Sequence, residues 1–479
     1  MEESFSANNN GFLNDAVEDN NLGSGTGLNG DAAIKAGMSS SKQDETLIAF
    51  FGRVNYVYKD RYVAQVSLRR EGSSKFGDNN KWGNFPSASV AWNVSNEDFM
   101  KNQRVLSNLK LRLGYGVTGN SGISPYQSMV TLSGGNSYLN PNGQWLQTWG
   151  PSRNPNEDLK WEKKKKWNFG VDFGVLDNRI TGALDVYKRT ADDLLMTGVT
   201  VPSPSYIHST STVNIGSISS SGLELTLNAV PIAKKDFQWR TTVTLSKIFS
   251  NKLNEFSYST ADYLEFGDIG GYGALGNAVR LYAGSEIGNF YGKRFAGFDE
   301  SGEWLFYNKE GEAVPASEIY DDDLTVIGNG QPKWYLAWSN TFNYKNFDLS
   351  FMLKGRFGYD ILNRLKMFYS NMTTLQAGYN VLNSTFEDGV NASYQYSDYY
   401  LEKGNYLRLD NITLGYNFKN KNVKWPSFRV YVTATDLFTI TGYDGLNPEM
   451  DDTGMSPSME SCGRTPVTRS VSVGLNVKF

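Results

Sequence analysis

Histidine and cysteine are almost missing from this chain of 479 residues. Cys462 is its single cysteine and His208 its single histidine, so no disulfide can form within the chain. A structural zinc site needs several such ligands, and a serine–histidine–aspartate triad needs a histidine placed beside its nucleophile. The composition argues against both. We therefore predict no enzyme, no metal site and no cofactor.

Long apolar runs and a surplus of one charge are also lacking. No stretch of about 18 apolar residues is present, which argues against a transmembrane helix, and the mean hydropathy is -0.45. The 46 basic and 50 acidic residues nearly balance, so nothing indicates a nucleic-acid partner. A membrane-spanning β-strand is still compatible, because it needs only about ten residues with one apolar face.

Alternation of apolar and polar side chains is what the chain has in abundance. It is clearest at residues 471–479, where Val471, Val473, Leu475, Val477 and Phe479 alternate with small or polar residues. Successive side chains of a strand point to opposite faces, so this segment has one apolar and one polar face. A period of two that recurs along a chain indicates strands.

We predict about 15 strands from this pattern. They cover residues 44–58, 61–71, 86–95, 108–119, 160–175, 179–190, 213–230, 236–249, 276–284, 288–298, 333–345, 347–358, 403–419, 427–440 and 467–479. A shift of the apolar phase near Asp410-Asn411 predicts a β-bulge there.

The connections between these strands alternate in length. Short ones such as Lys59-Asp60, Asp177-Asn178 and Asn420 to Pro426 alternate with long ones such as 120–159 and 359–402, once a strand is allowed at 276–284. Short periplasmic turns and long outer loops are typical of outer-membrane barrels. The fold class we predict is therefore all-β, an antiparallel transmembrane β-barrel.

The start of the chain does not fit a whole barrel. Residues 1–6 have neither the basic start nor the apolar core of a signal peptide. If the last strand runs toward the periplasm, counting back places residues 1–43 outside the cell as a loop segment. Complete bacterial barrels have even strand numbers, and open sheet edges in lipid are costly. We expect residues 44–479 to be the C-terminal portion of a barrel whose front is missing.

Eight blocks of sequence occur in an order that one transporter family has. They are residues 51–56, 59–62, 67–77, 80–87, 111–120, 344–350, 406–412 and 435–449. In these blocks the chain resembles the C-terminal barrel region of SusC/RagA-like TonB-dependent transporters, the nutrient importers of Bacteroidetes outer membranes.

The resemblance implies a barrel of about 22 strands around an N-terminal plug, so that roughly seven strands, the plug and the TonB-contacting segment are absent here. It also implies outer-membrane import of oligosaccharides or peptides. The implied partners are a SusD-like surface lipoprotein, outer-membrane lipid, and TonB acting only through the missing plug. An inactive fragment or pseudogene product is the first alternative. A soluble secreted glycan-binding β-protein is the second, although it does not explain the alternating connections.

Three sets of residues are candidates for function. The final strand would carry the barrel-assembly signal, and polar positions of other strands would line the lumen. Aromatic residues of the loop 120–159 would contact substrate or a partner, or else pack loops over the barrel mouth. The sets are, in that order, Val473, Leu475, Val477 and Phe479; Arg112, Asp172, Glu224, Asp348 and Arg408; and Tyr126, Tyr138, Trp145 and Trp149.

Three further features each have a purely structural interpretation beside a functional one. The acidic loop 299–332 offers oxygen ligands for Ca²⁺, but it also suits a solvated loop. Lysines 163–166 could face anionic lipid or form a solvated rim. Aromatic residues near strand ends could form a girdle at the lipid headgroups or a soluble core; they are Tyr56, Tyr58, Tyr62, Trp82, Phe85 and Trp92.

Overall fold

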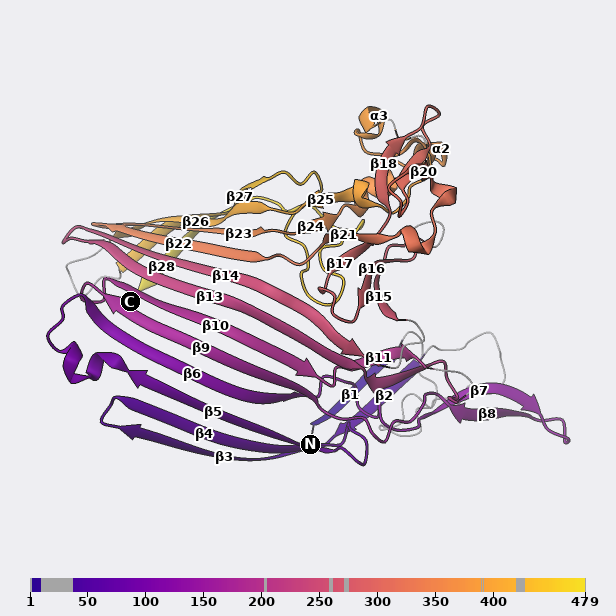
Figure 1. Cartoon of the computed structure of the whole chain (residues 1–479), viewed down its shortest axis with the longest axis horizontal. Helices are drawn as coiled ribbons and strands as arrows, with labels where there is room; N and C mark the ends of the chain where they lie inside the picture. The colour runs from indigo at the N-terminus through magenta and orange to yellow at the C-terminus, as the bar shows by residue number, and fades with distance from the viewer. Residues whose placement is uncertain are drawn as a thin grey trace.

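A single large antiparallel sheet dominates the computed structural model, which describes residues 2–9, 38–201, 205–257, 262–270, 275–388, 390, 392–418 and 427–478. Thirteen strands of the sheet neighbour one another in chain order (Figure 1). They are β3 (Leu47–Tyr58), β4 (Tyr62–Ser73), β5 (Trp82–Asn93), β6 (Leu106–Asn120), β9 (Glu162–Val175), β10 (Ile180–Asp192), β13 (Gly216–Ala233), β14 (Phe237–Phe256), β22 (Trp334–Tyr344), β23 (Phe347–Phe357), β26 (Tyr406–Phe418), β27 (Ser427–Thr441) and β28 (Ser470–Lys478). The predicted all-β, antiparallel class is confirmed.

Two of the fifteen predicted strands lie elsewhere, which corrects the strand count. Residues 276–284 and 288–298 form β16 (Asn277–Tyr282), β17 (Asn289–Gly292) and β18 (Arg294–Phe298), which belong to small separate sheets. Consecutive residues of β16, such as Ala278 and Val279, are fully buried, so both faces of this strand pack against protein. A wall strand would leave one face to lipid.

Tight turns and long connections gather at opposite ends of the sheet. Left-handed backbone at Lys59 and Asp60, and at Asp177 and Asn178, closes two of the tight turns. With β16 to β18 assigned to one long connection between β14 and β22, short and long connections alternate without any extra wall strand. The turn predicted from Asn420 to Pro426 lies outside the described residues. The bulge predicted at Asp410 is confirmed, because the neighbours Met352 and Leu353 of β23 pair with Asn411 and Leu409, which leaves Asp410 as the extra residue.

One face of the sheet is apolar and exposed. Val90, Leu113, Phe169 and Val186 follow one another in register across β5, β6, β9 and β10, and all four are exposed. Lipid would cover such a row in a barrel wall. Among the described residues, no helix is both long and apolar enough to cross a membrane.

Aromatic rings lie at both ends of this apolar face. Trp92 stacks with Tyr62 near the tight turns, and Trp82 stacks with Phe50 toward the other end. The ten residue-to-residue steps from Trp82 to Trp92 span about 34 Å of strand, or about 26 Å after a tilt of about 40°. That height matches the apolar band of outer-membrane barrels, about 25 Å. Phe85 is the exception to the predicted girdle, because it is buried against Trp161 and Val117.

The largest buried core among the described residues lies mostly in the long connections, with Leu253 of β14 as its contact to the sheet. It includes Trp304, Phe306, Phe290 and Tyr400, all nearly or fully buried. Figure 1 places these elements together beyond one end of the sheet. Besides β16 to β18 they include β15 (Tyr263–Asp268), β19 (Trp304–Tyr307), β20 (Ala313–Pro315), β21 (Thr325–Asn329), α1 (Arg364–Tyr369), α2 (Met372–Gln376) and α3 (Thr385–Asp388).

Four two-stranded sheets also occur among the described residues. They are β1 (Glu2–Asn9) with β2 (Met38–Glu45), β7 (Leu132–Leu139) with β8 (Trp145–Pro151), β11 (Leu195–Thr200) with β12 (Thr210–Asn214), and β24 (Asp360–Leu362) with β25 (Leu401–Lys403). Figure 1 shows β7 and β8 projecting beyond the other elements.

Candidate functional site

The polar face of the sheet carries ion pairs that join strands far apart in the sequence. Arg112 on β6 donates to Asp172 on β9 at 2.8 Å and to Asp185 on β10 at 3.0 Å. Asn168 donates to the other oxygen of Asp185 at 2.7 Å. Gly170 lies between these groups, and a Cβ there would come within 2.6 Å of both Arg112 and Asp185. The glycine therefore leaves room for the ion pairs to form.

Asp348 and Arg429 form a second cluster near the tight-turn end. The Arg429 guanidinium on β27 donates to both carboxylate oxygens of Asp348 on β23. Asn417 on β26, the strand between them, also donates to Asp348 at 2.7 Å. Three adjacent strands are thus joined on their polar face.

Arg408 ties a long connection to the wall. Its side chain is 4% exposed and donates to Glu449 at 2.9 Å, to Asn447, and to Thr439 at 2.8 Å. Glu449 and Asn447 belong to the connection between β27 and β28, whereas Thr439 is on β27. Lys354 on β23 adds an ion pair to Glu449 at 3.1 Å. The connection therefore folds back along the polar face instead of extending away from it.

The predicted lumen residues thus share the polar face, but they do not form one cluster. Glu224 on β13 pairs in register with Asp185 and Ser246 and is exposed. Three ion-pair partners of the predicted lumen residues were not candidates in the sequence analysis: Asp185, Arg429 and Glu449. Asp185 and Arg429 lie on the polar face, and only the strand pairing brings each together with a partner 73 or 81 residues away.

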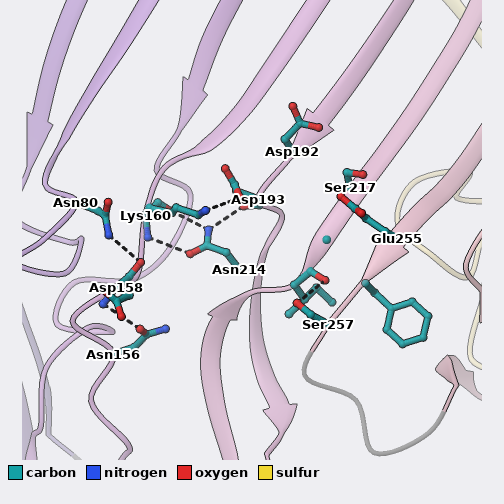
Figure 2. A pocket seen from close by; sticks show the side chains of 13 residues that line it. Asn80, Asn156, Asp158, Lys160, Asp192, Asp193, Asn214, Ser217, Glu255 and Ser257 are labelled. Carbon is teal, nitrogen blue, oxygen red and sulfur yellow. Dashed lines mark hydrogen bonds and ion pairs between the residues drawn. The ribbon is translucent and has the colours of Figure 1, made fainter.

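A polar cavity lies at the outer ends of β10, β13 and β14, with a volume of about 680 Å³ (Figure 2). Asp193, Asn214 and Asn156 bring carboxylate and amide groups to it, and Lys160 pairs with Asp193 at 2.7 Å. Asp158, Asp192 and Glu255 also line it, so acidic side chains outnumber Lys160, its one lysine. Such a surface can hydrogen-bond polar solutes. Among the described residues no group of acidic, histidine or cysteine side chains converges as metal ligands.

The four candidate aromatic residues of the loop 120–159 separate into two groups. The Tyr126 hydroxyl accepts a hydrogen bond from the Asp44 amide at 2.8 Å, so this ring lies within the folded loops. Tyr138, Trp145 and Trp149 lie on the β7–β8 hairpin and are 51%, 70% and 65% exposed. The described part of the chain therefore does not bury these three rings, and the loop-packing interpretation does not fit them.

Acidic residues of the loop 299–332 already have partners within the protein. Asp299 accepts hydrogen bonds from the Ser301 hydroxyl and from the Ser301 and Glu303 amides, and these lower the pKa of Asp299. Asp323 accepts from the Tyr320 and Lys309 amides, which lowers its pKa likewise. Asp321 pairs with Arg280 at 2.9 Å. The described residues of this loop do not bring several acidic side chains together around one point, and the Ca²⁺ site stays a prediction.

The last strand, β28, pairs with β27 and places Val473, Leu475 and Val477 on one face, all exposed. Phe479 lies outside the described residues. Lysines 163–166 alternate between the two faces of β9. Lys165 pairs with Asp192 at 2.7 Å, and Lys164 pairs with Glu162 at 3.2 Å.

The comparisons with known proteins agree on one protein family. The family model described as TonB dependent receptor-like, beta-barrel, matches residues 3–437. TonB-dependent receptor SusC of Bacteroides thetaiotaomicron is 34% identical over 425 residues, which are 85% of this chain and 41% of that protein. TonB-dependent receptor P3 of Formosa agariphila is 30% identical over 488 residues, 93% of this chain and 47% of the relative.

A solved structure of similar fold is that of the RagAB peptide transporter. It superposes with a TM-score of 0.79 at 24% identity, covering 96% of this chain and 50% of the other. This chain spans about half the length of the curated relatives it matches.

Proposed function

Because this chain belongs to the TonB-dependent receptor β-barrel family and is SusC/RagA-like, we propose that it forms the wall and outer loops of a nutrient importer. Barrels of this family lie in the outer membrane. The proposed cargo is an oligosaccharide or a peptide, moved without catalysis. TonB would act through a plug, and a SusD-like surface lipoprotein would deliver the cargo.

The observation that carries the proposal is the chemical difference between the two faces of one sheet. Its apolar face is exposed in register across β5, β6, β9 and β10, whereas its polar face is laced with ion pairs. Lipid on one side and water on the other explain this contrast. All long connections lie at one end, where a lipoprotein partner would meet them.

Residue roles follow from position. We propose that Tyr138, Trp145 and Trp149 contact the partner or its cargo, because they project on an exposed hairpin. Arg112, Asp172, Glu224, Asp348 and Arg408 would line the lumen. We also propose that residues 1–43 form an outer loop, that 44–479 is barrel, and that β28 carries the assembly signal in Val473, Leu475, Val477 and Phe479.

The test is uptake by cells. The gene that encodes this chain is deleted and restored in its host, and uptake of a panel of oligosaccharides and peptides is measured. We expect loss of at least one solute on deletion and its recovery on restoration. Unchanged uptake of every solute, or absence of the chain from the outer-membrane fraction, would contradict the proposal.

A matched pair of variants then tests the hairpin. Trp145→Ala with Trp149→Ala should reduce co-purification of the lipoprotein encoded by the neighbouring gene. Tyr320→Ala is the control, because Tyr320 is an equally exposed aromatic residue, 71% exposed, on another loop. Equal effects of both variants would contradict the proposal that the hairpin contacts the lipoprotein.

A further inference from the structure

A recess on the polar face of the sheet is lined by positive charge. Its volume is about 530 Å³, and its walls include Lys164, Lys166 and Arg189. No aspartate or glutamate is among its lining residues, in contrast to the acidic cavity of Figure 2. The two hollows near the outer end of the sheet thus differ in the sign of their charge.

Two of these cations lie beside the same aromatic ring. Lys166 and Arg189 face each other in register across β9 and β10. The Lys166 ammonium lies 5.2 Å from the centre of the Tyr187 ring, and the Arg189 guanidinium lies 5.4 Å from it. Tyr187 is itself buried. Within the described residues neither cation has an ion-pair partner, whereas Lys164 is paired with Glu162.

The floor of the recess consists of small residues. Ser87 lies opposite Gly116, and Ser89 lies opposite Gly114. A Cβ added at Gly116 would meet only the Ser87 Cβ, at 3.5 Å, an ordinary contact. Strand packing therefore does not require glycine there. Glycine within a strand often marks close approach of a ligand or another backbone, and here it leaves open space beside two unpaired cations.

The recess lies close to the outer mouth. Arg189 is three residues before Asp192, the last residue of β10, which is about 10 Å along the strand. A solute entering from the side of the long connections would meet it early. Because it is on the polar face, lipid headgroups do not reach it.

We propose that this recess binds the carboxylate or sulfate group of an incoming solute, with Lys166 and Arg189 as its ligands. Arginine binds planar oxyanions through paired N–H groups, and lysine adds a compact positive charge. The inference rests on the proposed import function and narrows it to solutes that carry negative charge.

The experiment measures binding by the full chain in detergent. The probes are a sulfated disaccharide, a uronate-containing disaccharide and an acidic tetrapeptide, each with a neutral counterpart, followed by calorimetry at low and high salt. We expect an anionic probe to bind about tenfold more tightly than its counterpart, and less tightly as salt rises. The probe that binds best separates sulfate from carboxylate and glycan from peptide.

A pair of variants on the same two strands gives the control. Lys166→Gln with Arg189→Gln removes two charges from the polar face. Lys163→Gln with Lys188→Gln removes two charges from the opposite face of β9 and β10. Only the first pair should abolish the preference for anions, and Lys166→Arg with Arg189→Lys should retain it. Circular dichroism verifies that each variant is folded.

A second variant tests the shape of the site. Gly116→Met should fill the recess and weaken binding of the disaccharides without changing charge. Equal losses in both glutamine pairs, or no preference for anions in the unaltered chain, would overturn the inference. Anionic and neutral probes that bind the unaltered chain equally tightly would leave the import function standing while the anion site fails.

Discussion

Replacing Arg408 by methionine should release part of the connection between β27 and β28 from the wall. Methionine keeps much of the apolar stem but loses the hydrogen bonds to Glu449 and Asn447. A hydrogen bond to a charged group contributes about 1.5–3 kcal/mol. Glu449 keeps Lys354 as a partner at 3.1 Å, so its carboxylate is not left unpaired. We therefore expect the tether to lose about 2–3 kcal/mol, less than the sum of two such bonds.

That loss corresponds to about a 30- to 150-fold increase in local opening. Hydrogen–deuterium exchange measures it directly, because the Glu449 amide donates to Asn447 and the Met450 amide to Pro448. Exchange should accelerate at residues 446–452. It should stay slow at Glu460, whose amide donates to the Leu362 carbonyl outside the released segment.

Arg429→Met is the matched control for this experiment. Arg429 also pairs with a carboxylate on the polar face, but its partner Asp348 is on a strand and not on the connection. This variant should leave exchange at 446–452 unchanged. Equal acceleration in both variants would mean that the wall loosens as a whole, and no acceleration in the Arg408 variant would refute the tether.

Two more predictions concern pH and assembly. Burial raises the pKa of Glu460, so the native state holds a proton that the unfolded chain releases, and stability should fall as pH rises above the ordinary glutamate pKa of about 4.3. Glu460→Gln should flatten this pH dependence in unfolding midpoints measured from pH 4 to pH 8. An unaltered pH dependence would contradict the role of Glu460. Deleting Phe479 from the gene at its full encoded length should lower the amount of chain in the outer-membrane fraction, whereas unchanged insertion would remove Phe479 from the assembly signal.

Strand positions were readable because alternation is a local property. Val90, Leu113 and Phe169 each lie in a segment of period two, and each is on the exposed apolar face. The bulge at Asp410 was also visible, since one extra residue shifts the phase of everything after it. These features need no knowledge of which strands meet.

Long-range pairing was not readable in the same way. Arg112 and Asp185 are 73 residues apart, and only the register of β6, β9 and β10 brings them together. The segments 276–284 and 288–298 were placed in the wall because short apolar runs look alike in lipid and in a protein core. The cationic recess was missed because only the register of β6, β9 and β10 brings Lys166 beside Arg189 and Gly116.

The core around Trp304 and Tyr400 has a consequence for how this surface can change. Its apolar contacts are made mostly within the long connections and otherwise with the ends of β13 and β14, so their shape does not depend on the lipid that covers the sheet. Substitutions on the outside of these connections can alter what they recognise while the wall stays in register. The molecule thus combines a part that the membrane holds in place with a part that holds its own shape in water.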